Sequence, residues 1–230
     1  MKPRTLLWVA LVILGLGAQL LRAGSAAVFT HQTQNTGNTF TTAASFATDT
    51  PTPTATPTPT ATPTPSCSTG DTGFLNPSDQ TADTGGDGNG FEVDPTNAFA
   101  DDSSYALNVD GPGDRHRYYG YAISIPSGCS IKGIEARLDW WLESTEGTNS
   151  MSVELSWDGG TTWTAAKSDS TETISEHTAV LGGSADTWGR TWTLADLSDA
   201  SFRARVTSDS DQESMDFYLD WVPVRVYYGP

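Results

Sequence analysis

Basic residues are scarce in this chain of 230 residues: 12 Lys and Arg stand against 28 Asp and Glu, which gives a formal net charge of −16. A nucleic-acid-binding protein needs a basic stripe to neutralise phosphates, so that class is excluded. The same charge disfavours docking to the anionic surface of a membrane. The chain also has only two cysteines, which are too few for a disulfide-dense scaffold or a zinc site with four Cys ligands.

Residues typical of catalytic sites are also few. The three histidines, His31, His116 and His177, lie in unrelated contexts and show no metal-binding spacing such as H-E-x-x-H. The chain contains no G-x-S-x-G nucleophile elbow. We therefore expect a protein that is not an enzyme.

The N-terminus has the three parts of a secretory signal peptide. Lys2 and Arg4 precede an apolar stretch over residues 6–18, and small residues follow at 24–27. The apolar stretch is shorter than the ~20 residues that a membrane span needs. We predict that residues 1–26 are a cleaved signal peptide and that the protein is secreted or displayed on the cell surface. The alternative is an uncleaved segment, which would be the chain's one link to a membrane.

Residues 27–49 form a short, mostly polar segment that we expect to be strand-like. It contains the sequence T-G-N-T-F at residues 36–40. This stretch resembles the start of the TasA/camelysin family, with His31 where that family usually has Asp and residues 42–44 in place of its Ala-Gly-Thr. The resemblance covers residues 6–46 and implies a secreted subunit of cell-surface or matrix fibres.

Such a segment can act as an assembly strand, with Val28, Phe29 and Phe40 as its apolar residues. A tethered strand can complete the sheet edge of a neighbouring subunit, because the tether raises its effective concentration.

A linker follows over residues 50–65, with the sequence TPTPTATPTPTATPTP. Proline fixes φ and lacks an N–H group, so neither a helix nor a sheet ladder can form there. We predict a semi-rigid polyproline-II spacer of about 50 Å, since each residue of this helix rises by ~3.1 Å. The threonines are candidate sites for O-glycans, and the alternative is a spacer without glycans.

The remaining residues, 67–230, show the alternation of β-strands and no long stretch with helical periodicity. Apolar and polar residues alternate in the stretches 134–140, 151–157, 202–206 and 217–221, and clusters of Gly, Asn, Asp and Ser separate the runs. Further strands are expected over 118–125, 178–181, 91–93 and 105–109, a helical turn over 194–197, and a bulge or sheet edge at Pro223. The predicted fold is all-β: a jelly-roll-like antiparallel β-sandwich after the signal peptide and the Thr/Pro linker.

The order of several short motifs in this domain also resembles a secreted module of Chloroflexota-like bacteria. The matching stretches are G-D-G-N-G-F-E at 86–92, D-R-H-R at 114–117, S-W-D-G-G at 156–160, T-W-G-R-T-W at 187–192 and D-W-V at 220–222. The resemblance covers most of residues 71–228. The module has no assigned role, so it implies a fold and a compartment only.

The sharpest local motif is an Asp-box, S-x-D-x-G-x-T-W, formed by Ser156, Asp158, Gly160, Thr162 and Trp163. Its carboxylate can accept hydrogen bonds from amides of the turn, and its glycines permit a positive φ. We interpret it as a structural hairpin.

The densest acidic region follows residue 83. Calcium prefers oxygen ligands, and neighbouring glycines allow a tight loop. The predicted Ca²⁺ ligands are Asp87, Asn89, Glu92 and Asp102, and the alternative is a solvated acidic loop without an ion.

Seven tryptophans fall in the domain, and alternation places Trp140, Trp157 and Trp221 inside. Trp141 then points to the opposite face, and Trp188 lies in a loop flanked by glycine. Exposed aromatic rings can stack on the C–H groups of sugars, so Trp141 and Trp188 are the candidate carbohydrate-binding residues.

Cys67 and Cys129 are expected to form a disulfide in an oxidising compartment, with two free thiols as the alternative. Two functions remain open at this point. The first is a structural or assembly protein of the cell surface or extracellular matrix, such as a filament subunit, whose partners are further copies or other surface proteins. The second is a carbohydrate-binding module on a Thr/Pro stalk, with a polysaccharide as partner.

Overall fold

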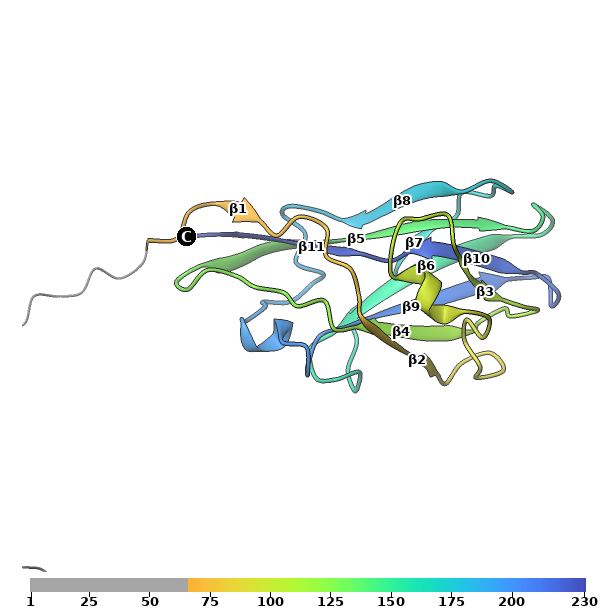
Figure 1. The fold of residues 1–230 in the computed structure, drawn as a ribbon, viewed down its shortest axis with the longest axis horizontal. Coiled ribbons are helices and arrows are strands. Elements are labelled where there is room, and N and C mark those ends of the chain that lie inside the picture. The colour runs from red at the N-terminus through yellow and green to blue at the C-terminus, as the bar shows by residue number, and fades with distance from the viewer. Residues whose placement is uncertain (1–65) are drawn as a thin grey trace, which may run out of the picture. The chain divides into compact units, whose positions relative to one another are not determined.

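The computed structural model describes residues 66–230, which form two antiparallel β-sheets packed face to face (Figure 1). The predicted all-β antiparallel sandwich is confirmed. No helix within these residues is long and apolar enough to cross a membrane. The predicted signal peptide, the linker and the assembly strand with Val28, Phe29 and Phe40 lie outside the described residues.

Sheet A is built around β5, the longest strand. Strands β10 and β11 pair with one edge of β5, and β8 pairs with the other edge. Strand β3 adds to β10, and β1 adds to β11. The strands of this sheet are β1 (Gly70–Asp71), β3 (Ala106–Asn108), β5 (Ser130–Leu142), β8 (His177–Gly182), β10 (Phe217–Trp221) and β11 (Val224–Gly229).

Sheet B has five strands in the order β2-β4-β9-β6-β7. Two short 3₁₀ helices, η1 (Pro95–Ala98) and η2 (Ala195–Leu197), lie in the connections between strands, and η2 confirms the predicted helical turn. The strands of sheet B are β2 (Asp79–Asp83), β4 (Arg115–Tyr119), β6 (Asn149–Ser156), β7 (Lys167–Asp169) and β9 (Arg203–Ser210).

The core lies between the sheets and follows the alternation of the sequence. Ile134, Ala136, Leu138 and Trp140 of β5 are all 0% exposed, and the residues between them face away from the core. Burying a side chain of the size of Leu or Phe stabilises a fold by about 1.5–3 kcal/mol. Because β5 has partners on both edges, its alternation fixes which side chains reach solvent in the middle of sheet A.

The expectation that Trp221 is a core residue is wrong, since it is partly exposed on the outer face of sheet A. Trp157 is only partly buried but packs against the core, so its predicted inward direction is confirmed in part. A β-bulge between Leu219 and Trp221 shifts the register of β10 against β5 by one residue. Trp221 therefore lies under the guanidinium of Arg137, 4.6 Å from its ring centroid, on the outer face. Strand β6 ends at Ser156, so the alternation stops before Trp157.

Two predicted strands are shorter than expected. The strand expected over 118–125 ends at Tyr119, because Gly120 and Ala122 have positive φ values of 73° and 51°. The stretch 91–93 contributes a single β-bridge, from Val93 to Leu107. The sequence predicts a bulge or a sheet edge at Pro223. Instead the strand breaks there into β10 and β11, which both pair with β5 inside the sheet, and a bulge lies earlier, between Leu219 and Trp221.

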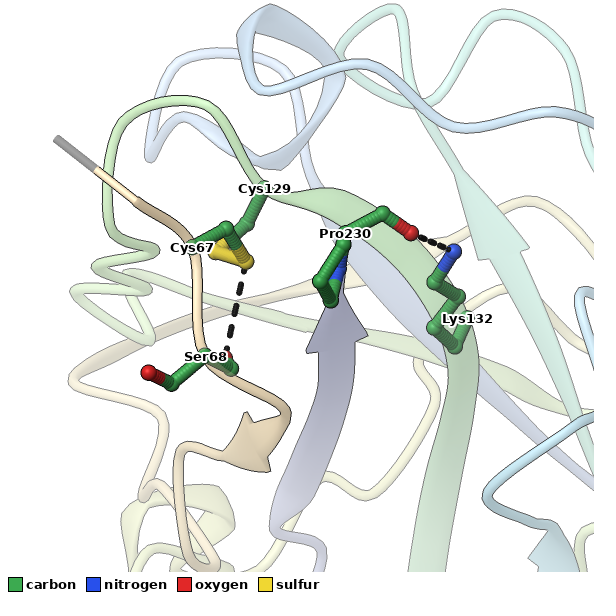
Figure 2. The surroundings of a disulfide bond; sticks show 5 residues. All are labelled: Cys67, Ser68, Cys129, Lys132 and Pro230. Atoms are coloured by element: carbon green, nitrogen blue, oxygen red, sulfur yellow. Dashed lines mark hydrogen bonds between the residues drawn. A yellow bond between two sulfur atoms is a disulfide. The ribbon is translucent and has the colours of Figure 1, made fainter. Parts of the chain in front are cut away.

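The predicted disulfide is present. Cys67 is bonded to Cys129, which directly precedes β5, and their Cα atoms are 5.1 Å apart. Figure 2 shows this bond beside Pro230, whose carbonyl oxygen accepts a hydrogen bond from Nζ of Lys132. The start of the sandwich is therefore held close to the point where β11 ends.

Candidate functional site

Three aromatic side chains gather on the outer face of sheet A. Trp141 on β5 and Tyr218 on β10 are direct cross-strand partners, and their rings are parallel within 4° with centroids 5.2 Å apart. Tyr105, which directly precedes β3, meets both rings edge-on, with centroids 5.2 Å from Trp141 and 5.1 Å from Tyr218. Tyr105 is 41% exposed, and the other two side chains are half-buried. We call these three residues the aromatic cluster.

The backbone of sheet A places the aromatic cluster. Trp140 is fully buried, so its neighbour Trp141 points to the opposite face of β5, as the sequence predicted. Parallel-offset and edge-on contacts are the arrangements that aromatic quadrupoles favour. Burial is the main cause that raises the pKa of Tyr218, followed by the charges of Asp216 and Glu143, so its hydroxyl stays neutral.

No cation covers the aromatic cluster, which separates it from the other tryptophans. Trp140 belongs to the core, and the five other tryptophans of residues 66–230 apart from Trp141 stack against a basic side chain. In residues 66–230, no Arg or Lys makes such a contact with Tyr105, Trp141 or Tyr218. The covered rings are Trp157 and Trp192 under Arg190, Trp163 under Arg205, Trp188 under Lys167 and Trp221 under Arg137.

A group of carboxylates lies beside the aromatic cluster on the same face. Asp139 is two residues before Trp141 on β5, and Glu176 directly precedes β8, the strand paired with β5. One carboxylate oxygen from each of Asp101, Asp139 and Glu176 lies within 4.8 Å of the other two. Asp220 on β10 is not one of these three, but it lies near enough to Glu176 for its charge to add to the effect of burial and raise the pKa of Glu176. We call Asp101, Asp139, Glu176 and Asp220 the carboxylate cluster.

Two members of the carboxylate cluster, Asp139 and Asp220, are 0% exposed. Oδ1 of Asp139 accepts hydrogen bonds from Oγ1 of Thr178 at 2.7 Å and Nε of Arg137 at 2.8 Å. Oδ2 of Asp220 accepts one from the backbone N–H of Ser103 at 3.1 Å. Oδ1 of Asp220 has no hydrogen-bond partner.

The charges of the carboxylate cluster are poorly balanced. Within residues 66–230 its one paired cation is Arg137, whose Nη2 lies 2.6 Å from Asp139 and 3.4 Å from Asp101. Burial raises the pKa of Glu176, and the charges of its neighbours in the cluster raise it further. Burial is also the main cause that raises the pKa of Asp220.

The four predicted Ca²⁺ ligands do not converge. Nδ2 of Asn89 donates to Asp87 at 2.8 Å, whereas Glu92 accepts a hydrogen bond from the backbone at the end of β3. Asp102 lies in the loop after η1 and accepts a backbone hydrogen bond there. The acidic residues of this set bring no three oxygens within 4.8 Å of one another, and Ca²⁺ binding at them stays a prediction.

The expectation that Trp188 is an exposed binding residue is wrong. Its side chain is 5% exposed, and its Nε1 donates to the carbonyl oxygen of Ile134 at 2.8 Å. Its backbone has a positive φ of 55°, which turns the ring back onto sheet A instead of toward solvent.

The Asp-box forms the hairpin that its sequence predicts. Oδ1 of Asp158 accepts hydrogen bonds from the hydroxyl of Ser156 at 2.9 Å and the backbone N–H of Thr162 at 2.8 Å. Desolvation opposes ionisation here, but the hydrogen bonds outweigh it and lower the pKa of Asp158 to about 2. Gly160 has a φ of 94°, and Trp163 closes a β-bridge with Ser156. The motif therefore ends a strand of sheet B and lies outside the candidate site.

Sequence reasoning found Trp141 and missed the other residues of the site. Tyr218 and Asp220 are in an alternating stretch that was recognised as a strand, but the strand that pairs with it was unknown. Tyr105 is expected at the start of a strand over 105–109, but it directly precedes β3, and Glu176 directly precedes β8. Alternation therefore gave no direction for either side chain. The register Trp141–Tyr218 is the missing information, because it brings residues 77 positions apart together.

The described residues enclose no ligand-sized cavity, so the candidate site is an open surface. No family model and no curated protein sequence matches the chain. One similar solved structure is "CBM32 of AlyQ in complex with 4,5-unsaturated mannuronic acid", with a TM-score of 0.37 and 12% identity over 66% of this chain and 96% of that chain. Another is the CBM22-1–GH10 part of endo-1,4-β-D-xylanase 10B from Clostridium thermocellum, complexed with xylohexaose. Its TM-score is 0.30 and its identity 10%, and the match covers 69% of this chain and 26% of that chain.

Proposed function

We propose that this chain is a non-catalytic carbohydrate-binding module whose ligand stacks on the aromatic cluster of sheet A. The observation that supports this proposal is the set of three surface rings without a covering cation, Tyr105, Trp141 and Tyr218. An exposed aromatic face is an apolar surface that a pyranose can cover with its C–H groups. The hydroxyl groups around the sugar ring then need polar partners at the edge of the platform.

Carboxylates at the edge of the aromatic cluster supply such partners. Asp216 and Glu143, which are partly exposed and exposed, lie near Tyr218. Ionised carboxylates accept strong hydrogen bonds from hydroxyl groups. The same carboxylates repel anionic sugars, so the proposed ligand is a neutral polysaccharide.

The shape of the surface favours an internal stretch of the polysaccharide. A chain end is bound best in a closed pocket, whereas the described residues offer an open face. A linear polymer can lie across β3, β10 and β5 without a free end.

The test compares binding of neutral and anionic polysaccharides by the full chain and by two tryptophan variants. Trp141→Ala should weaken binding of the neutral ligand about thirtyfold, since an aromatic hot spot contributes about 2 kcal/mol. Trp163→Ala is the matched control, because Trp163 is also partly exposed but lies on the other sheet under Arg205, 4.1 Å from its ring centroid. Affinity electrophoresis and calorimetry measure binding, and circular dichroism checks the fold. Equal binding by Trp141→Ala and wild type would contradict the proposal.

A role in fibre assembly stays a separate prediction. It depends on residues 27–49, which lie outside the described residues. Export, display on the Thr/Pro spacer and a strand donated to a neighbour are compatible with a sandwich that binds polysaccharide. Filaments formed by the full chain, observed by electron microscopy, would support the assembly role.

A further inference from the structure

We propose that the carboxylate cluster of sheet A, formed by Asp101, Asp139, Glu176 and Asp220, binds one Ca²⁺ ion. This site differs from the acidic loop that the sequence suggested, and it does not depend on the carbohydrate proposal. Three oxygens of the cluster already lie within 4.8 Å of one another. Ligands on opposite sides of one Ca²⁺ ion are about 5 Å apart, because Ca–O distances are 2.3–2.6 Å. No large backbone movement is therefore needed to bring these oxygens to one ion.

The buried carboxylate of Asp220 is an independent sign of a missing ligand. Its side chain is 0% exposed, and its Oδ1 has no hydrogen-bond partner within residues 66–230. In addition to burial, its charge raises the pKa of Glu176, so the two carboxylates repel each other. A buried carboxylate oxygen without a partner is costly, and most such atoms in proteins are satisfied. A cation bound between Asp220 and Glu176 would satisfy this atom and remove the repulsion between the two groups.

The charge of the cluster also fits a divalent cation. Among residues 66–230, the one guanidinium that pairs with the four carboxylates is that of Arg137, and it is occupied by Asp139 and by the ring of Trp221. Its contact with Asp101 is long, at 3.4 Å, so Asp101 can turn toward an ion without breaking a short ion pair. A divalent cation would bring the local charge close to neutral.

The composition of the site favours Ca²⁺ over Mg²⁺. Mg²⁺ requires near-ideal octahedral geometry at about 2.0–2.1 Å, whereas Ca²⁺ accepts irregular sets of carboxylate and water oxygens. Asp101 and Glu176 are exposed, so an ion can enter from solvent and keep water molecules as further ligands. Ca²⁺ sites of extracellular modules bind with a Kd of about 10⁻⁴–10⁻³ M.

The experiment is a calorimetric titration of the full chain with Ca²⁺ after treatment with a chelator, together with its thermal unfolding with and without Ca²⁺. Wild type should bind one Ca²⁺ per chain, with weaker binding of Mg²⁺ and a higher Tm in Ca²⁺. Asp101→Asn and Glu176→Gln should each weaken Ca²⁺ binding at least tenfold. Both side chains are exposed, so these variants are expected to fold.

Asp87→Asn is the matched control, because Asp87 is an exposed acid of the loop predicted from the sequence. It should bind Ca²⁺ as wild type does. Absence of Ca²⁺ binding at millimolar concentration would overturn the proposal, as would binding that survives Asp101→Asn and Glu176→Gln. Loss of Ca²⁺ in Asp87→Asn alone would place the ion in the other loop. Trp141→Ala should leave the Ca²⁺ affinity unchanged, so failure of the carbohydrate proposal and failure of this one are separable.

Discussion

The outer faces of the two sheets carry similar types of residue but handle charge differently. On sheet B, the carboxylates of Asp83 and Glu154 are matched by the guanidinium groups of Arg117 and Arg205. On sheet A, Asp101 and Asp139 share the guanidinium of Arg137, and no Lys or Arg within residues 66–230 pairs with Glu176 or Asp220. The carboxylates on sheet B are therefore paired within the protein, whereas sheet A carries carboxylates without a paired cation.

The aromatic cluster differs in the same way from the ring of Trp163 on sheet B. The guanidinium of Arg205 lies 4.1 Å from the ring centroid of Trp163 and covers it. On sheet A, Arg137 covers Trp221, but no Lys or Arg within residues 66–230 covers Trp141 or its two aromatic neighbours. Groups that pair within the protein contribute to its stability. Unpaired carboxylates and uncovered aromatic rings are instead available to bind a ligand.

The largest expected effect on stability comes from removing Asp83, the shared partner of two arginines on sheet B. Asp83 is buried, and the hydrogen bonds from Arg117 and Arg205 outweigh desolvation and hold its pKa well below the usual range. Asp83→Ala leaves two guanidinium groups without their shared partner, and we expect a loss of about 3 kcal/mol in the free energy of unfolding. Urea denaturation measures this loss. Asp79→Ala, an exposed acid of the same strand, should cost less than about 0.5 kcal/mol, and equal losses would contradict a structural role for the network.

The second effect is a dependence of stability on pH that arises on the inner side of sheet B. Burial lowers the pKa of His116 to about 4, and its Nδ1 accepts a hydrogen bond from the backbone N–H of Phe91 at 3.0 Å. Between pH 6.5 and 4 the unfolded chain binds a proton at this residue that the folded chain does not. Stability therefore falls as the pH falls through this window, by about 3 kcal/mol for this group.

The carboxylates of sheet A act in the opposite direction. The raised pKa values of Asp220 and Glu176 mean that the folded state binds their protons first, so these groups contribute stability as the pH falls. His116→Gln separates the two effects, because the acids are common to both proteins. Urea denaturation at pH 7 and at pH 4 should show a smaller loss in His116→Gln than in wild type. The same loss in both would show that His116 is not the titrating group.

Much of the fold follows from local sequence. Alternation along residues 134–140 determines which face of β5 enters the core, and the Asp-box determines its own hairpin. Alternation failed at Trp221, because a bulge depends on how β10 meets β5 and leaves no mark in the run 217–221. It failed at Trp188, because a single hydrogen bond to Ile134 and a positive φ decide where a loop residue points.

The site was less predictable than the fold because it is assembled by register. The carboxylate cluster combines residues that are far apart in the chain. Asp139 and Asp220 lie on β5 and β10, Glu176 directly precedes β8, and Asp101 lies in the loop after η1. Local density of acids pointed instead to the loop around Asp87, where the carboxylates bind neighbouring amides. Acidic residues that are close in the sequence therefore indicated a turn, whereas the carboxylates of the carboxylate cluster are close only in the folded structure.

The smallest expected effect is also the one that most directly sharpens the contrast between the two faces. In the absence of Ca²⁺, Glu176→Gln removes one of four like charges, so it should raise the free energy of unfolding by about 0.5 kcal/mol, the scale of an exposed charge interaction. Glu154→Gln, on sheet B, removes a partner of Arg205 at 2.6 Å and should lower stability instead. Thermal unfolding in a chelator measures both variants. Destabilisation by both would mean that Glu176 is already satisfied within the protein. The alternative result is that Glu176→Gln is stabilising in a chelator and that this stabilisation disappears when Ca²⁺ is added. That result would mean that the excess negative charge of sheet A binds the ion, because a bound cation converts the repulsion between the carboxylates into attraction to the cation.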